Sequence, residues 1–192
     1  MEKKRIAIFA SGTGSNAVNL IHFFKNDSQV EVAFVLSNKS DAKVLDSAKE
    51  LGIKTYYFSN SEVADGAFLT NFCQKKDIDW VILAGYLRLI PAELIQAYDH
   101  RMINLHPSLL PNYGGKGMHG SNVHKAVIAN QETKSGISIH FVNEEFDKGE
   151  IIAQFHCALN EQDTVETLEG KIRYLEQTYL PTVVRGAILN EK

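Results

Sequence analysis

Residues 5–16 read Arg-Ile-Ala-Ile-Phe-Ala-Ser-Gly-Thr-Gly-Ser-Asn. The first half is a short, continuous apolar run, which is typical of a strand buried on both faces of a parallel sheet. The second half is a glycine-containing turn, and a helix-like segment over about residues 16–24 follows it. This strand–turn–helix order predicts the opening of a doubly wound α/β fold.

The same alternation continues along the first half of the chain. We expect helices over residues 41–51 and 61–73, and strands over residues 30–36, 55–58 and 80–84. Strands separated by single helices are joined by right-handed crossovers and form a parallel sheet. The helices then cover both faces of that sheet.

The second half changes character after a short predicted strand at residues 102–105. A glycine-rich loop at 113–120 and a helix at 121–130 precede two β-like runs, 136–142 and 151–159, which a loop alone separates and which could pair antiparallel. Asp163 and Glu166 predict a capping box for a final amphipathic helix. We therefore expect one domain over residues 1–192, an α/β fold with a doubly wound, mostly parallel sheet and a mixed edge.

Composition and charge restrict the class of protein. The 192 residues include 20 Lys and Arg against 23 Asp and Glu, a net charge of −3, whereas nucleic-acid-binding domains are usually basic. Cys73 and Cys157 are isolated, which argues against a disulfide framework or a zinc site. No apolar run approaches the roughly 20 residues that cross a membrane, so we expect a cytoplasmic protein.

The glycine turn after the first strand is a candidate phosphate site. Gly12 and Gly14 let the backbone approach a ligand, and the free amides of the following helix favour an anion. Ser15 and Asn16 could donate further hydrogen bonds or cap the helix. Ala17 replaces the third glycine of a dinucleotide motif, which favours a monophosphate. The alternative is a tight turn that needs glycine for its backbone alone.

Asn104 and His106 form the second candidate site. They alternate along one short strand, so their side chains share a face near the carboxyl ends of the sheet, where α/β proteins bind ligands. A carboxamide can stabilise an oxyanion and an imidazole can move a proton, which suits acyl-group chemistry. The alternative is a histidine satisfied by backbone groups at a strand end.

Other polar residues are less informative on their own. His119 and His124 are five apart, which does not place two ligands on one helical face, so we expect no metal site. His140 lies inside an apolar run and is interpreted as a core or edge residue that could also face the ligand crevice. In the acidic loop over residues 143–149, composition does not distinguish Asp147 from its two glutamates.

Four segments resemble the glycinamide ribonucleotide formyltransferase family. Residues 9–16, 83–90, 104–111 and 138–142, the last leading to Phe146 and Asp147, occur in the same order as in that family. The resemblance covers nearly the whole chain. It differs in the loop at 114–120, which is longer and richer in glycine than in the family versions, so the resemblance gives that loop no role.

The resemblance implies specific roles. Asn104, His106 and Asp147 match the catalytic oxyanion donor, the proton-handling imidazole and the carboxylate beside it. The nucleotide-binding positions match Gly12, Thr13, Gly14, Ser15, Asn16, Arg173 and Glu176. The folate-binding positions match Tyr86, Leu87, Arg88, Leu89, Ile90, Val142 and Asn143. The N-terminal half is then expected to bind the phosphate, and the C-terminal half to bind folate and carry catalysis.

The implied reaction transfers a formyl group from 10-formyltetrahydrofolate to the amine of 5′-phosphoribosylglycinamide in purine synthesis. It implies small-molecule partners, no metal, no nucleic acid and no membrane, in a monomer or homodimer. The alternatives are a formyltransferase acting on methionyl-tRNA, a formyl-folate hydrolase, and a non-catalytic module that binds folate or a nucleotide. The first two carry an additional domain, and the third leaves Asn104, His106 and Asp147 unexplained.

Overall fold

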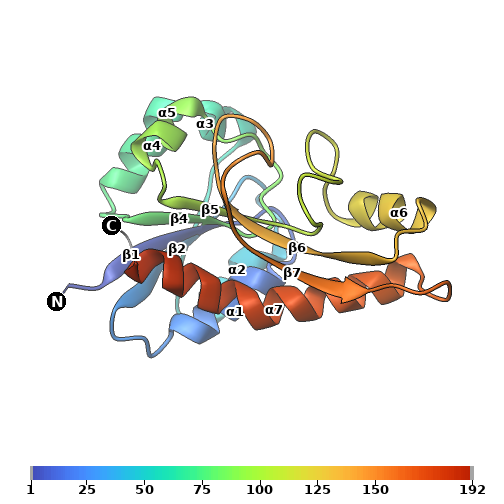
Figure 1. The fold of residues 1–192 in the computed structure, drawn as a ribbon. Helices are drawn as coiled ribbons and strands as arrows, with labels where there is room; N and C mark the ends of the chain where they lie inside the picture. Colours follow the sequence, from blue (N-terminus) through green and yellow to red (C-terminus); the bar gives the residue numbers. More distant parts are fainter. Residues whose placement is uncertain (1, 191–192) are drawn as a thin grey trace.

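The computed structural model describes residues 2–190, which form one layered α/β unit around a seven-stranded sheet (Figure 1). The strands are β1 (Lys4–Phe9), β2 (Val30–Ser37), β3 (Lys54–Tyr57), β4 (Trp80–Leu83), β5 (Met102–His106), β6 (Lys134–Phe141) and β7 (Ile151–Ala158). The helices are α1 (Ser15–Phe24), α2 (Lys43–Glu50), α3 (Asn60–Ala64), α4 (Gly66–Gln74), α5 (Ala92–Ala97), α6 (Ser121–Ala129) and α7 (Val165–Leu189).

The strand order is β3-β2-β1-β4-β5-β6-β7. Strands β1 to β5 pair in parallel, whereas β6 is antiparallel to both of its neighbours, β5 and β7. The predicted mostly parallel sheet with a mixed edge is confirmed. The loop between β6 and β7 contains no crossover helix, as an antiparallel pair allows, whereas β5 and β6 are antiparallel although α6 lies between them.

Alternate residues of the central strands feed two separate cores. Ile6 and Ile8 of β1 belong to the core beneath α1, α2 and α7, and Ala7 and Phe9 belong to the core beneath α3, α4 and α5. Figure 1 shows these two helix groups on opposite sides of the sheet. Because both faces are covered, the buried part of the strand, Ile6 to Phe9, is apolar at every position, as the opening sequence indicated.

The single helix predicted over residues 61–73 is wrong, because the chain forms α3 and α4 there. Asp65 separates them in an extended conformation, and its side chain accepts a hydrogen bond from the backbone of Phe68, which caps α4. A Cβ at Gly66 would lie 2.1 Å from a carboxylate oxygen of Glu93, so α4 packs closely on the start of α5. The sequence did not predict α5.

The capping box predicted for the last helix is present, but the predicted pair, Asp163 and Glu166, does not form it. The N-cap of α7 is Thr164, whose hydroxyl accepts a hydrogen bond from the backbone N–H of Thr167. The hydroxyl of Thr167 in turn accepts one from the backbone N–H of Thr164. Asp163 instead binds the ammonium of Lys171 at 2.7 Å. No helix within residues 2–190 is long and apolar enough to cross a lipid bilayer.

Candidate active site

A cavity of about 520 Å³ lies at the carboxyl ends of the central strands. Its walls include Leu83 at the end of β4, Asn104 and His106 on β5, and Asn16 at the start of α1. This is the edge where a doubly wound sheet binds ligands. The loop between β6 and β7 adds Asp147, so residues distant in the sequence share one cavity.

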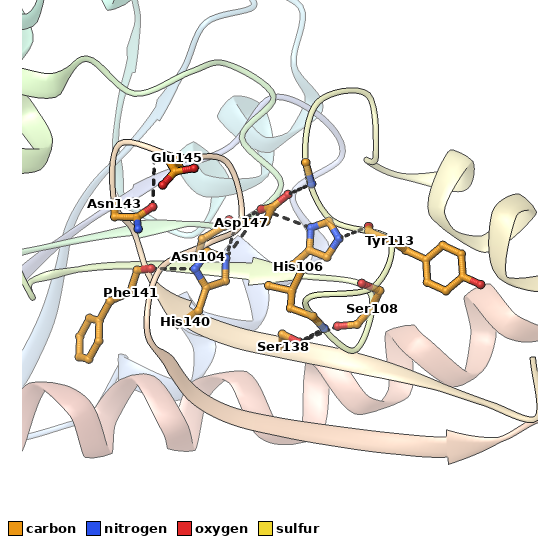
Figure 2. A network of polar contacts seen from close by, with 12 residues as sticks. Asn104, His106, Ser108, Tyr113, Ser138, His140, Phe141, Asn143, Glu145 and Asp147 are labelled. Carbon is orange, nitrogen blue, oxygen red and sulfur yellow. Dashed lines mark hydrogen bonds and ion pairs between the residues drawn. The ribbon is translucent and has the colours of Figure 1, made fainter.

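Asn104, His106 and Asp147 lie together, as Figure 2 shows. One carboxylate oxygen of Asp147, Oδ1, lies 3.4 Å from Asn104 Nδ2 and 3.5 Å from His106 Nδ1. The other oxygen, Oδ2, accepts a 2.8 Å hydrogen bond from the backbone of Gly115. The contacts at Oδ1 are longer than ordinary hydrogen bonds, so the amide and the imidazole can also approach a substrate oxygen.

His140 determines how the Asn104 amide is oriented. Its side chain is buried, and its Nδ1 donates to the carbonyl oxygen of Phe141 at 2.7 Å, because a carbonyl can only accept. Burial lowers the pKa of His140, which favours the neutral ring. Its Nε2 then accepts from Asn104 Nδ2 at 3.1 Å. Both earlier interpretations hold, since His140 is a buried residue that also lines the cavity.

The glycine turn has two glycines with different roles. A Cβ at Gly14 would lie 2.1 Å from Val44 Cγ2, and Gly14 has φ 78°, so packing and conformation both require glycine. A Cβ at Gly12 would meet nothing within 4 Å, so the fold does not demand glycine there. Open space beside Gly12 is consistent with a ligand that approaches the backbone.

Asn16 joins this turn to the last helix instead of capping α1. Gly14 is the N-cap of α1 and no side chain caps it, so the suggested capping by Ser15 or Asn16 is wrong. The amide of Asn16 donates to a carboxylate oxygen of Glu176 at 2.9 Å. Burial raises the pKa of Glu176, and the hydrogen bond from Asn16 opposes that effect. Asn16 and Glu176 both line the cavity.

The segment after β4 forms an apolar rim. Tyr86 and Ile90 are buried, whereas Leu87 and Leu89 are 46% and 58% exposed. The backbone N–H of Leu87 donates to the hydroxyl of Ser11, at the start of the glycine turn, at 2.9 Å. The rim and the glycine turn are thus connected, and the exposed leucines offer a surface for a flat apolar ligand.

The cavity collects most of the predicted site residues. Those that line it are Asn16, Tyr86, Leu87, Arg88, Leu89, Ile90, Asn104, His106, Val142, Asn143, Asp147 and Glu176. Those outside its lining are Gly12, Thr13, Gly14, Ser15 and Arg173. Sequence reasoning missed Ile95 and Met118 in the lining, because Ile95 lies on the unpredicted α5 and Met118 in the glycine-rich loop.

The fold and this site define a formyl transferase. The chain belongs to the formyl transferase family, whose model matches residues 4–184. Within that family it belongs to the phosphoribosylglycinamide formyltransferases, as its relatives show. The Bacillus subtilis enzyme of that name is 34% identical, over 95% of this chain and 93% of the relative. The chloroplastic enzyme of Arabidopsis thaliana is 41% identical, over 99% of this chain and 67% of the relative.

A solved structure agrees with this assignment. The phosphoribosylglycinamide formyltransferase of Bacillus halodurans superposes with a TM-score of 0.87 at 35% identity. The match covers 98% of this chain and 96% of that one. The overall fold of this chain is therefore that of a known enzyme architecture.

Proposed function

We propose that this chain transfers the formyl group of 10-formyltetrahydrofolate to the primary amine of 5′-phosphoribosylglycinamide. The observation that carries the proposal is the convergence of Asn104, His106 and Asp147 in one cavity of about 520 Å³. A donor amide, an imidazole and a carboxylate there match the needs of acyl transfer to an amine. The products are formylglycinamide ribonucleotide and tetrahydrofolate.

The nucleotide binds between the glycine turn and α7. The backbone amides of Gly12 to Asn16 and the start of α1 hold the phosphate, since a helix N-terminus favours an anion. Arg173, which is exposed on α7 one turn before Glu176, adds a positive charge on that side. The carboxylate of Glu176, already hydrogen-bonded by Asn16, is available to a sugar hydroxyl.

The folate binds on the other side of the catalytic residues. Its flat pterin packs against the apolar rim of Leu87, Leu89 and Ile90, and Val142 and Asn143 also line this cavity. Arg88 lies in the same rim, where its guanidinium can pair with a folate carboxylate. This arrangement directs N10 and its formyl group towards Asn104 and His106.

The chemical step is an addition followed by an elimination. The substrate amine attacks the formyl carbon, and the carbonyl electron pair moves to oxygen to give a tetrahedral oxyanion. Asn104 Nδ2 and protonated His106 donate hydrogen bonds to that oxyanion. The bond from carbon to N10 then breaks as the oxyanion collapses, and N10 takes the proton that the attacking amine loses. The route needs neither a metal nor a covalent enzyme intermediate.

Asp147 stabilises the charges that this step creates. Its Oδ1 lies 3.5 Å from His106 Nδ1, so the carboxylate orients the imidazole that donates to the oxyanion. A water molecule held by the same carboxylate can carry the proton from the amine to N10. The backbone amide of Gly115, bonded to Oδ2, fixes the carboxylate during the transfer.

A spectrophotometric assay with a 10-formyl-dideazafolate and phosphoribosylglycinamide tests the proposal. Folate product should form only when the nucleotide is present. His106→Ala and Asp147→Ala should each lower turnover by about 10²-fold or more, in line with the loss of a general acid–base group. His156→Ala is the matched control, because His156 is exposed on β7 and does not line the cavity.

Other outcomes identify the alternatives. Product without the nucleotide indicates a formyl-folate hydrolase, and binding of folate without any product indicates a non-catalytic module. Near-normal turnover in either His106→Ala or Asp147→Ala, with folded protein confirmed by circular dichroism, overturns the roles given to these two residues.

A further inference from the structure

Both ring nitrogens of His106 face hydrogen-bond acceptors. Nδ1 lies 3.5 Å from Asp147 Oδ1, and Nε2 lies 2.8 Å from the backbone carbonyl oxygen of Tyr113 (Figure 2). A carbonyl oxygen cannot donate, so Nε2 carries a hydrogen in the neutral and in the protonated ring. Nδ1 is therefore the nitrogen that gains and loses the proton, on the side of Asp147.

The backbone at Tyr113 adopts a conformation that an aromatic residue rarely occupies. Its φ is 57°, in the left-handed region, and Asp147 has φ 55°. Among the described residues, few non-glycine positions have positive φ, and these two are the pair that contacts the His106 ring. A left-handed backbone costs free energy and persists where surrounding contacts hold it.

The phenol of Tyr113 supplies such contacts. It donates to Glu132 Oε1 at 2.7 Å and accepts from Asn130 Nδ2 at 2.9 Å. Glu132 and Asn130 lie in the connection between α6 and β6, and β6 pairs directly with β5, where His106 lies. The phenol thus fixes the loop after β5 to the connection that leads into β6.

Two further observations agree with an anchoring role. Burial raises the pKa of the Tyr113 phenol, and acceptance by Glu132 raises it further, so the phenol remains a donor at neutral pH. The Tyr113 side chain does not line the cavity, so the phenol acts outside the space where substrates bind.

We infer that Tyr113 is a positioning residue for the formyl transfer: anchored by Glu132 and Asn130, it holds its carbonyl oxygen against His106 Nε2. This fixes the ring orientation and leaves Nδ1 as the nitrogen that exchanges the proton beside Asp147. The expected effect on kcat rests on the proposed function. The state of the ring itself is independent of that function.

Tyr113→Phe tests the inference, because it removes the hydroxyl and keeps the ring. We expect kcat to fall about threefold to tenfold, as the loss of hydrogen bonds at one anchor would predict, with KM for both substrates within about twofold. Glu132→Ala removes the acceptor of the Tyr113 hydroxyl and should lower kcat as Tyr113→Phe does. Glu132→Gln keeps an acceptor oxygen, so its kcat should stay near that of the wild type. Tyr57→Phe, at an exposed tyrosine on β3, is the matched control.

Nitrogen-15 spectra of histidine-labelled protein provide a readout that a merely structural role would not change. In the wild type, Nε2 of His106 should be protonated and its hydrogen should exchange slowly with water. In Tyr113→Phe, that exchange should become faster and Nδ1 should become protonated in part of the neutral rings. The His106→Gln spectrum identifies the His106 signals.

Two results would overturn the inference. One is an unchanged His106 signal in folded Tyr113→Phe protein, whatever happens to its activity. The other is a loss of kcat that Glu132→Ala does not reproduce. Failure of the proposed function is distinguishable, because the wild type would then form no folate product with the nucleotide, or would form it without the nucleotide, while the His106 signals would still report on the anchor.

Discussion

In the proposed reaction, the amide of Asn104 can stabilise the oxyanion only if its nitrogen, and not its oxygen, faces the formyl group. His140 enforces this orientation because its Nε2 accepts from Asn104 Nδ2. His140→Phe removes the acceptor and keeps an aromatic ring, so we expect kcat to fall about tenfold or more while both KM values change little. His140→Gln offers an acceptor oxygen and should recover part of kcat. Steady-state kinetics with each substrate varied would measure both effects.

The matched control for that prediction is His100→Phe, because His100 is exposed beside Phe141, outside the cavity lining. A His140→Phe variant with wild-type kcat would show that Asn104 orients itself without His140. A variant in which KM alone rises would make His140 a binding residue instead.

At the residue scale, the sequence predicted which side chains share a face of a strand, but not which backbone atom contacts them. Asn104 and His106 were predicted because alternation along a strand places their side chains on one face. The contact between the Tyr113 carbonyl and His106 Nε2 was not predicted. Every residue has a carbonyl, and the local sequence does not show which carbonyl lies beside the imidazole. Its anchors, Glu132 and Asn130, come near only after β6 pairs with β5.

Two hydrogen bonds connect the helices α1 and α7, one in the cavity lining and one outside it. Breaking each in turn distinguishes an effect on nucleotide binding from an effect on helix packing. Asn16 donates to the carboxylate of Glu176 inside the cavity lining, and Asn19 donates to the carbonyl of Gln177 on the exposed side. Asn16→Ala should raise KM for the nucleotide about tenfold and leave KM for the folate unchanged, because a lost polar contact to the bound state costs about that factor.

Asn19→Ala is the control, since it breaks a hydrogen bond between the same two helices away from the cavity. It should leave both KM values near those of the wild type. Thermal unfolding of the two variants would show how much each bond stabilises the helix pair. Equal rises in nucleotide KM in both variants would mean that helix packing, and not contact with the ligand, determines nucleotide affinity.

At the scale of elements, the buried strands were easier to predict from the sequence than the ends of the helices. The strands β1 and β4 were predicted because a strand covered on both faces must be apolar throughout. The break between α3 and α4 was missed, because an Asp such as Asp65 can lie inside a helix or cap the start of one. The local sequence does not decide between these two positions, and in the structure Asp65 caps α4. The box at the start of α7 uses Thr164 and Thr167, one residue later than the predicted pair.

At the scale of the whole molecule, the succession of strands was predictable and the shape of the cavity was not. Alternating strands and helices leave few topologies, and the carboxyl edge of the sheet is where loops can form a site. The cavity walls come from several loops, including the glycine-rich loop whose Gly115 binds Asp147. Such contacts between loops leave no periodic pattern in the sequence.

Burial of two histidines makes the stability of the whole molecule depend on pH. Burial lowers the pKa of His124 on α6 and of His140 on β6, although Glu169 raises the first and the Phe141 carbonyl and Asp147 raise the second. In the unfolded chain both take up a proton near pH 6.5, as ordinary histidines do. Below that pH the unfolded state binds more protons than the folded state, so stability falls.

Thermal unfolding between pH 7.5 and 5.5 measures this effect. The free energy of unfolding should decrease as the pH falls below about 6.5, by at most about 1.4 kcal/mol per pH unit for each histidine. His124→Asn should flatten the decrease, because it removes one of the two groups. Glu176 opposes them, since its raised pKa makes proton uptake favour the folded state, so Glu176→Gln should steepen the decrease. A wild-type stability that stays level or rises from pH 7 to pH 5.5 would show that proton uptake by these buried histidines does not control unfolding.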